Sequence, residues 1–340
     1  MFIVNHRKFF YTFSAILVIA SILAICIWGL DLGIDFKGGT LVELNYPTGA
    51  GSAFPNGRPD QATVLSQISS ISAVAPNLEP SIQPTGDTGY IIRLRNVTEP
   101  EKVAVESALG VTGSGTGNNV ASSTAVSGTA VASSTNLGTV QEKQFDSIGP
   151  VLGAQAARAS IMAIVFVVLA IVLFIAFAFR KVSQPISSWK YGIVAVVGLI
   201  HNVIIPTGLF AILGHFYGYE VDTLFVTALL VVLGFSVHDT IVVFDRVREN
   251  LRHAPAKKPF ADIVGESINQ TFTRSINTSL TALFALVVLY FVGGESTQHF
   301  ALTLIVGIAA GTYSSICIGS PLLVTWEKWQ AKKAQKAKKS

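Results

Sequence analysis

One carboxylate lies deep inside a long apolar stretch of this chain, and it is the first residue to which chemistry can be assigned. Asp239 falls in the run 223–244, which is long enough to cross a membrane as a helix. A charge in a bilayer is costly, so an ionisable residue there is a candidate for function by default. At helical spacing Asp239 shares a face with Val242 or Val243 and then with Arg246, which predicts a proton or charge path toward Arg246. The alternative interpretation is that Asp239 has a structural role and forms hydrogen bonds that hold neighbouring helices together.

Three other polar residues are candidates to act with Asp239. His201 and Asn202 lie in the middle of the run 191–213. An imidazole has a reference pKa of about 6.5, so His201 is suited to a proton relay, although a hydrogen-bonded packing histidine is an equally good interpretation. His238 is adjacent to Asp239 and points roughly 100° away around a helix, so we expect it to have a different role. Because these two neighbours cannot both aim at one ion from a regular helix, we expect no metal site.

Two further patterns in the apolar runs concern helix packing rather than chemistry. In the fifth run and just before it, four polar residues fall on one helical stripe that is expected to face protein: Thr271, Arg274, Thr278 and Thr281. In the sixth run, small residues recur every four positions and predict a seam where two helix backbones approach closely: Gly307, Gly311, Ser315 and Gly319.

Several familiar motifs of catalysis do not occur in the sequence. It contains no phosphate-binding loop G-x-x-x-x-G-K-[ST], no G-x-S-x-G elbow and no H-E-x-x-H zinc motif. Both cysteines, Cys26 and Cys317, fall in apolar runs, which excludes a disulfide framework and a metal cluster. We therefore expect neither an enzyme nor a cofactor. Any work must draw on an ion gradient, which supplies about 2.3 kcal/mol per charge per 100 mV.

The elements that must position these residues are membrane-spanning helices. The chain has 340 residues, of which 50% are apolar and 13% charged, with a mean hydropathy of +0.54, and this composition is that of a membrane protein. Each span needs about 20 apolar residues. Six runs meet that requirement: 9–30, 160–179, 191–213, 223–244, 275–292 and 300–325. The first resembles a signal peptide, but its length and the lack of a small-residue cleavage pattern favour an uncleaved helix.

Positive charges alternate from one side of the membrane to the other with the runs. Lysine and arginine favour cytoplasmic loops. The turns 214–222 and 293–299 contain neither, so we expect them outside the cytoplasm and both termini inside it. The basic tail 326–340 is interpreted as a topology signal, with contact to anionic lipid or ribosomal RNA as the alternative; no nucleic-acid partner is expected. The remaining cytoplasmic charges are Arg7, Lys8, Arg180, Lys181, Lys190, Arg246, Arg248, Arg252, Lys257, Lys258 and Arg274.

A separate domain is predicted between the first two spans, over residues 31–159, on the extracytoplasmic side. Alternating apolar residues predict strands at 40–46 and 88–94, and helical spacing predicts helices at 60–71 and 98–109. This order suggests a small α+β domain, in the ferredoxin-like class. The segment 111–139 is a low-complexity insertion of small and polar residues, which is typical of a loop or linker. The predicted domains are thus 1–30, 31–159, the bundle 160–325 and the tail 326–340.

Three stretches resemble the SecD/SecF family of protein-export membrane subunits. Residues 33–40 read G-I-D-F-K-G-G-T, which is similar to the signature shared by both subunits. Residues 234–250 resemble the SecF form of the fourth span, and residues 267–278 with 291–294 resemble the next helix. The positions that carry this signature are Gly33, Asp35, Phe36, Gly38, Gly39, Asp245, Arg248 and Arg274.

The resemblance implies an α-helical membrane protein with six transmembrane helices, which forms one half of a transporter of the RND superfamily. Such a half pairs with SecD and, through it, with the SecYEG channel and SecA in the cell inner membrane. The family uses the proton motive force, or sodium in some members, to assist late translocation of a preprotein, which the extracytoplasmic domain handles. Asp239 matches the family's acid in the fourth span, and Asp245, Arg246 and Arg248 match the cytoplasmic end of that span.

One position departs from the family pattern. The third span usually reads His-Asp, whereas this chain reads His201-Asn202. A neutral amide cannot bind and release a proton, so either SecD supplies the main carboxylate or coupling is altered. The insertion 111–139 is also unlike a compact family domain. The competing hypotheses are a free-standing RND-type exporter of small solutes and a membrane scaffold without ion coupling. A neighbouring SecD gene would favour the export subunit, and tolerance of Asp239→Asn would favour the scaffold.

Overall fold

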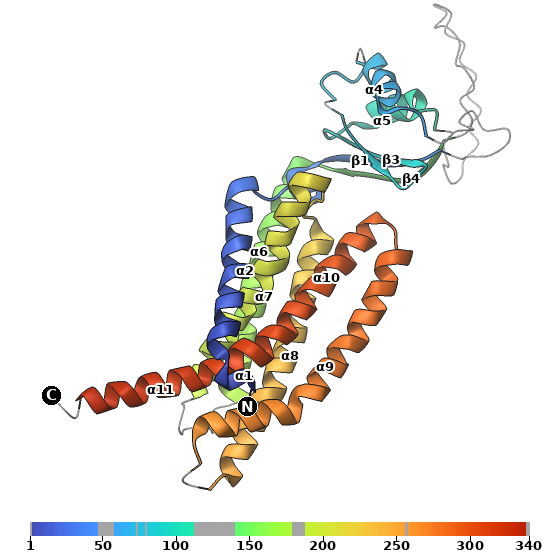
Figure 1. Ribbon diagram of the computed structural model, residues 1–340. Coiled ribbons are helices and arrows are strands. Elements are labelled where there is room, and N and C mark those ends of the chain that lie inside the picture. Colours follow the sequence, from blue (N-terminus) through green and yellow to red (C-terminus); the bar gives the residue numbers. More distant parts are fainter. Residues whose placement is uncertain are drawn as a thin grey trace, which may run out of the picture. The chain divides into compact units, whose positions relative to one another are not determined.

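The computed structural model consists of two compact units, which are described separately (Figure 1). The first contains Met1–Leu32 and Arg158–Ser340, and the second contains Gly33–Ala157. The structure describes residues 2–46, 58–72, 74–78, 80–111, 140–178, 188–255 and 258–337. The predicted low-complexity insertion lies outside the described residues from position 112 on, as do Arg180, Lys181, Lys257, Lys338 and Lys339.

The first unit confirms the six predicted spans. Each apolar run lies in a helix that is long and apolar enough to cross a membrane. A one-turn helix α1 (Phe2–Asn5) precedes the first of them. The spans are α2 (Arg7–Trp28), α6 (Pro150–Ala178), α7 (Ser188–Tyr217), α8 (Thr223–His253), α9 (Phe260–Val292) and a sixth made of α10 (Glu295–Ser314), the π-helical turn η1 (Ser315–Gly319) and α11 (Ser320–Ala337).

Several of these helices run far past their apolar segments, and α9 does so most. Helix α9 begins at Phe260, so Arg274, which was expected in the loop before the fifth span, lies more than three turns inside the helix. Hydropathy marks the apolar part of a helix, whereas proline ends its backbone hydrogen bonding. Here Pro255 and Pro259 fall in the connection between α8 and α9. The connection is therefore short, and its polar flanks are helical.

The centre of the bundle is formed by α7, α8 and α10, which pack against one another, while α2 packs on α7 and α9 packs on α8 and α10 (Figure 1). Small residues allow these approaches. A Cβ atom on Gly208 would overlap Ser21 of α2, and one on Gly307 would overlap Val232 of α8. Helix α6 has little contact with the rest, since 6% of its apolar window is buried.

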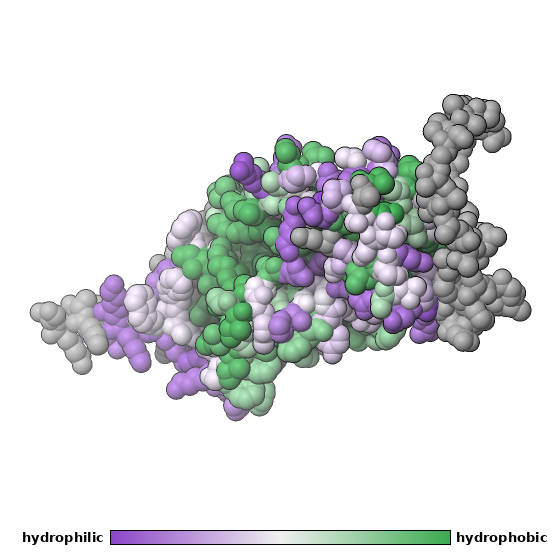
Figure 2. Space-filling view, turned by 90° about the horizontal axis from the view of Figure 1, so that it is seen from above, coloured by the Kyte–Doolittle hydropathy of each residue, from purple (hydrophilic) through white to green (hydrophobic). Residues whose placement is uncertain are grey.

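The outer surface of the helices is apolar. Hydrophobic side chains gather over it in the view of Figure 2. Large exposed apolar side chains occur along α2, α6 and α9, such as Ile16, Phe166 and Phe284. An exposed apolar surface of this extent fits a lipid environment or a protein partner within it. Together with the six spans, it makes the protein a multi-pass membrane protein.

The second unit is a four-stranded antiparallel sheet with two helices packed on it. Strand order in the sheet is β2-β3-β1-β4, and every neighbouring pair is antiparallel. The core places Val64 and Ile68 of one helix and Val105 of the other against strand residues such as Val42 and Ile92. The elements in chain order are α3 (Ile34–Lys37), β1 (Gly39–Asn45), α4 (Gln61–Ser70), β2 (Ser81–Thr85), β3 (Gly89–Leu94), α5 (Glu99–Ala108) and β4 (Gln141–Ile148).

Four of these elements lie where the sequence predicts them, and two strands were missed. The predicted elements are β1, β3, α4 and α5. The missed strands β2 and β4 occupy the two edges of the sheet. Strand β2 contains Pro84, which is tolerated at an edge, and most side chains of β4 are exposed, so neither has the apolar alternation of a half-buried strand.

Helix α5 begins with a hydrogen-bonded cap. Glu101 accepts from the backbone N–H of Thr98 at 2.8 Å and forms an ion pair with Arg95, whose Nη2 lies 2.5 Å from Oε1. Arg95 also donates to the carbonyl of Pro76 at 2.9 Å. The Arg95 guanidinium and, next, the Thr98 N–H lower the pKa of Glu101 from 4.5 to about 2. The ionised form of Glu101 therefore fixes both the start of α5 and the preceding loop.

This cap predicts a pH-dependent loss of local stability. The folded-state pKa of Glu101 is lower than its unfolded value, so its contribution is present above about pH 4.5 and is lost as the pH falls toward 2. We expect Glu101→Gln to reduce hydrogen-exchange protection of the first turn of α5 at pH 7 and to have no effect near pH 2. Glu99→Gln, in the same turn, is the control. Equal protection of wild type and Glu101→Gln at pH 7 would contradict the assignment.

The close contact of α8 with α10 predicts a difference between two glycine substitutions. Gly307→Ala places a methyl group into Val232 and should destabilise the bundle by about 1–3 kcal/mol. Gly234→Ala meets open space on α8 and, as a substitution in a helix, should be neutral or stabilising by up to about 1 kcal/mol. Thermal unfolding of the purified chain in detergent measures both. Equal melting temperatures for the two variants would refute this packing.

Candidate functional site

Asp239 lies inside the bundle on α8, with 5% of its surface exposed. It is the one acidic side chain among the buried residues of the described part of the chain. Its Oδ2 atom has no hydrogen-bond partner among the described residues. Helix α8 directs Asp239 inward because its buried face continues through Val232, Ser236 and Val243 at helical spacing. A buried carboxylate with an unpaired oxygen is the strongest candidate for ion coupling in this structure.

Hydroxyl groups from the neighbouring helices surround this carboxylate. Ser236, one turn before Asp239, is 1% exposed, and its Oγ has no partner among the described residues. Ser275 of α9 is equally buried, and its hydroxyl lies close enough to interact with the Asp239 carboxylate. Ser275 Oγ has no partner in hydrogen-bond geometry in the described part of the structure. Sequence reasoning missed both serines, because a serine in a helix is commonly satisfied by its own backbone.

His201 and Asn202 form a pair on α7. His201 Nδ1 lies 3.0 Å from Oδ1 of Asn202, and the imidazole ring is stacked on Tyr313 with ring centres 6.1 Å apart. An amide oxygen accepts hydrogen bonds, so the bond requires the proton on Nδ1. In neutral His201 this leaves Nε2 as an acceptor, and it has no partner among the described side chains. The pair is therefore able to take up a proton at Nε2.

Gly311 brings this pair near the residues of α8. A Cβ atom at Gly311 would lie 3.5 Å from Nδ2 of Asn202 and would overlap Oγ of Ser236. Asn202 and Ser236 thus meet at the surface of α10, where the absence of a side chain on Gly311 leaves room for both. Three spans converge at this point, one turn from Asp239. The seam of small residues in the sixth span lies at this convergence: Gly307, Gly311, Ser315 and Gly319.

The sixth span is interrupted at the seam by the π-helical turn η1. Ser315, its first residue, lies 2.8 Å from Oγ1 of Thr240 on α8, and Ser320 donates to the Ser315 carbonyl at 3.3 Å. A π turn inserts one residue into a helix, and such turns are frequent at functional sites. No signal in the sequence indicated this turn. Through Ser315, this turn gives Thr240, the residue after Asp239 on α8, a hydroxyl partner.

The remaining ion-coupling candidates lie away from the buried carboxylate. His238 is exposed, as its position around the helix predicts. Arg246, two turns beyond Asp239, donates to Oε1 of Gln270 at 2.7 Å and to Oε2 of Glu249 at 2.6 Å. Asp245 and Arg248 pair at 3.0 Å. Arg246 lines a polar pocket of about 450 Å³ between α8 and α9. The residues around this pocket are Ile241, Val242, Asp245, Arg246, Glu249, Gln270, Thr271 and Arg274.

One of the four residues in the predicted polar stripe of α9 is buried within this chain, and that protein covers the other three stays a prediction. Thr271 is buried, whereas Arg274, Thr278 and Thr281 are exposed on this chain. The stripe that the bundle buries is Thr271, Ser275 and Ser279, at offsets of four. The sequence carries both stripes on one helix, and spacing alone does not tell which one packs against α8 and α10.

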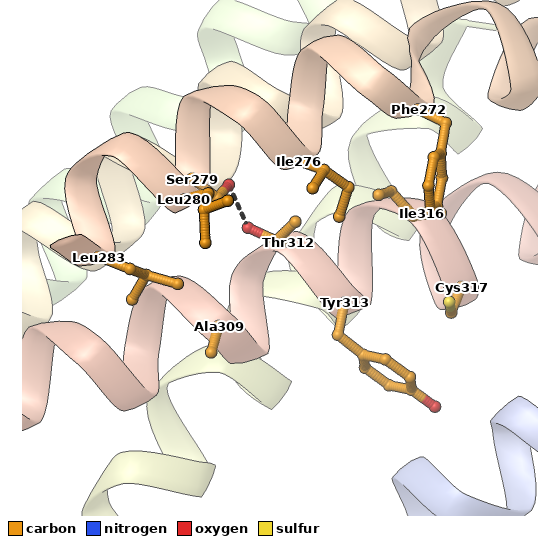
Figure 3. A pocket seen from close by; sticks show the side chains of 10 residues that line it. All are labelled: Phe272, Ile276, Ser279, Leu280, Leu283, Ala309, Thr312, Tyr313, Ile316 and Cys317. Atoms are coloured by element: carbon orange, nitrogen blue, oxygen red, sulfur yellow. Dashed lines mark hydrogen bonds between the residues drawn. The ribbon is translucent and has the colours of Figure 1, made fainter.

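An apolar groove separates α9 from the sixth span on one side (Figure 3). Its volume is about 320 Å³, and apolar side chains such as Phe272, Leu280 and Ile316 line it. Its hydroxyl groups are hydrogen-bonded: those of Ser279 and Thr312 bond to each other at 2.5 Å, and that of Tyr313 donates to the carbonyl of Phe10 at 2.9 Å. The free thiol of Cys317 also lines the groove. In the described residues no three His, Cys, Asp or Glu side chains gather as metal ligands.

The glycine-rich signature after the first span forms a tight joint in the second unit. Residues 34–37 make the single turn α3, after which Gly38 and Gly39 adopt φ angles of +77° and +142°. A Cβ on Gly38 would lie 2.7 Å from Cα of Pro150, and one on Gly39 would lie 2.9 Å from the carbonyl oxygen of Leu94. Both positions require glycine. Phe36 is buried, and Gly33 and Asp35 belong to the same turn. Because Gly38 packs against Pro150, the signature lies between β1 and the start of α6.

Comparison with known proteins gives a consistent result over the whole chain. Residues 129–329 match the family model "Protein export membrane protein SecD/SecF, C-terminal", and residues 29–46 match "SecD/SecF GG Motif". A "Protein translocase subunit SecF" of Thermobaculum terrenum is 40% identical over 96% of this chain and 93% of its own length. Another, of Anaerolinea thermophila, is 33% identical over 96% of this chain and 94% of its own length.

Fused proteins from one organism match in sequence and in structure. A "Protein translocase subunit SecDF" of Thermus thermophilus is 38% identical over 57% of this chain, which spans 24% of that protein. The crystal structure of SecDF, described as a translocon-associated membrane protein from Thermus thermophilus, matches with a TM-score of 0.73 and 27% identity. That match covers 96% of this chain and 38% of the SecDF chain.

Proposed function

Because this chain belongs to the SecD/SecF family of protein-export membrane proteins, as one of its SecF subunits, we propose that it is an accessory subunit of the Sec protein translocase. In this role it works with a SecD subunit, and through it with the SecYEG channel and SecA, in the cytoplasmic membrane. It assists late translocation of preproteins by using the proton or sodium motive force. The names of its relatives, SecF and SecDF translocase subunits, support the assignment to the Sec system.

The observation that carries the ion-coupling part of the proposal is the burial of Asp239. A carboxylate with an unpaired oxygen is costly inside a membrane bundle, and a role in binding an ion accounts for its presence there. His201 offers a second proton acceptor at Nε2. Asn202 orients this imidazole but carries no proton itself, so we propose that SecD supplies a further carboxylate to the relay.

The exposed polar stripe of α9 supports a protein partner inside the membrane. Arg274, Thr278 and Thr281 are exposed on a helix whose apolar window spans the bilayer, and Asn277 beside them is exposed as well. Thr278 and Thr281 donate to carbonyls of α9 itself, whereas lipid tails give the Arg274 guanidinium and the Asn277 amide no hydrogen-bond partners. We propose that a helix of SecD covers this stripe and brings a carboxylate to Arg274.

We propose that both termini are cytoplasmic and that the second unit is extracytoplasmic and handles the emerging preprotein. The positive-inside rule supports this, because Arg7 begins α2, Arg252 lies in the last turn of α8, and the turn between α7 and α8 has no lysine or arginine. We also assign the second unit to the ferredoxin-like class. In its favour, the chain order is strand, helix, strand, strand, helix, strand, and the sheet order is β2-β3-β1-β4.

The proposal predicts the effect of neutralising Asp239. In membrane vesicles with an imposed proton gradient, completion of preprotein export should lose its gradient dependence in Asp239→Asn, because an amide keeps the shape of the side chain but cannot take up a proton. Asn202→Asp, which restores a carboxylate next to His201, should retain gradient dependence. Gradient-dependent completion by Asp239→Asn would refute the coupling assignment and favour a scaffold.

The proposed SecD interface predicts a specific cross-link. With the native Cys26 and Cys317 replaced by serine, Thr278→Cys on the exposed stripe should form a disulfide with a cysteine introduced into a SecD span. Ser279→Cys, one residue away and 3% exposed, is the control and should not react. If a cysteine scan of all SecD spans gives no cross-link to Thr278→Cys, or gives equal yields for both positions, SecD does not cover this stripe.

A further inference from the structure

Several hydroxyl side chains along α9 bond to their own helix, and Ser275 does not. Ser267 and Thr271 donate to carbonyls four residues earlier in the helix at 2.7 and 3.0 Å, and Thr278 does so at 2.9 Å. This is the usual way in which a helix satisfies a serine or threonine in an apolar environment. Ser275 makes no such bond in the described structure, although it is 1% exposed. The Ser275 hydroxyl is therefore available to donate to an acceptor outside its own helix.

The next serine on the same face shows that α9 also bonds across to its neighbours. Ser279 lies 2.5 Å from the hydroxyl of Thr312 on α10 (Figure 3). One turn before it, Ser275 faces the interior in the same way, and there the acceptor within reach is the Asp239 carboxylate. Asp239 Oδ2 and Ser275 Oγ are thus two buried groups on packed helices, each unpaired among the described residues, and they are complementary as acceptor and donor.

Other hydroxyls near the carboxylate are directed elsewhere. Thr240 donates to the Ser236 carbonyl at 2.9 Å, and its Oγ1 lies 2.8 Å from Oγ of Ser315. Ser236 directs its Oγ to the surface of Gly311, next to Asn202. Ser236 and Ser275 are both unpaired among the described residues, and Ser275 is the one whose hydroxyl interacts with the Asp239 carboxylate.

We propose that Ser275 is a positioning residue for Asp239, whose hydroxyl donates to the ionised carboxylate and releases it when the carboxyl group takes up a proton. The proton enters at Oδ2, no covalent bond to Ser275 forms, and the serine keeps its own proton throughout. A protonated carboxyl group is itself a donor and no longer needs one. The bond between α8 and α9 thus exists in one protonation state of Asp239. This inference rests on the proposed function. It identifies the contact through which α9 responds to the ionisation state of Asp239 on α8.

An apolar carbodiimide tests this role, since such reagents react with protonated carboxyl groups in apolar surroundings. The assay uses full-length chain together with SecD in membrane vesicles at a fixed pH of about 7. Loss of the donor in Ser275→Ala favours the protonated form and should speed labelling of Asp239 on the order of tenfold. Ser275→Thr keeps a hydroxyl and should restore the wild-type rate.

Two controls separate positioning from a loss of structure. Ser279→Ala removes the neighbouring hydroxyl on the same face of α9 and should leave the labelling rate unchanged. Asp239→Asn should remove the label, which assigns the reaction to that residue. Comparable yields of folded complex for Ser275→Ala and Ser279→Ala, measured by gel filtration, would show that the fold is intact.

The outcomes are decisive for Ser275. A wild-type labelling rate in Ser275→Ala, the same acceleration in Ser279→Ala, failure of Ser275→Thr to restore the rate, or no Asp239-specific label in any variant would each overturn the proposal. Failure of the proposed function is recognised separately, by gradient-dependent export in Asp239→Asn. Accelerated labelling in Ser275→Ala combined with that result would keep the contact and reject the coupling.

Discussion

Inside a bilayer, every polar group must find its partner within the protein, and this constraint governs how the bundle is built. The central spans meet this requirement through close contact at small residues, such as Gly307 and Gly311, and through hydroxyls that bond to their own helix or across to the next one. Asp239 stands out because it is the one buried acid among the described residues and its oxygen Oδ2 is unpaired, as are the hydroxyls of Ser236 and Ser275. The bundle thus holds one carboxylate in a state that a proton or ion can change.

The same region contains the irregular part of the sixth span. The π turn η1 begins where Ser315 reaches across to Thr240, one residue past Asp239. Helix α9 approaches the carboxylate through Ser275. Two neighbouring helices therefore meet α8 at the level of the acid through side-chain hydroxyls, which exchange partners at low cost compared with a repacked apolar core. Such contacts suit a helix bundle that changes between two arrangements as its acid gains and loses a proton.

Much of this architecture could be predicted from the sequence, because the signals for it are local. Apolar length identifies the six spans, and a polar residue in an apolar run identifies Asp239, His201 and Asn202. Features that depend on contacts between distant segments could not be predicted. The edge strands β2 and β4 carry no apolar alternation of their own, and the π turn follows from packing rather than from composition. Helix α9 has two polar stripes, and only its neighbours determine that Ser275 faces the interior while Arg274 is exposed.

The central claim is that Asp239 gains and loses a proton during the working cycle. Infrared difference spectroscopy of the membrane-reconstituted complex with SecD, recorded with and without an imposed proton gradient, measures this directly through the C=O stretch of a protonated carboxyl group. The account predicts a carboxyl band in the wild-type difference spectrum that is absent from Asp239→Asn. An identical difference spectrum for both proteins would contradict it, because the protonation change would then belong to another residue.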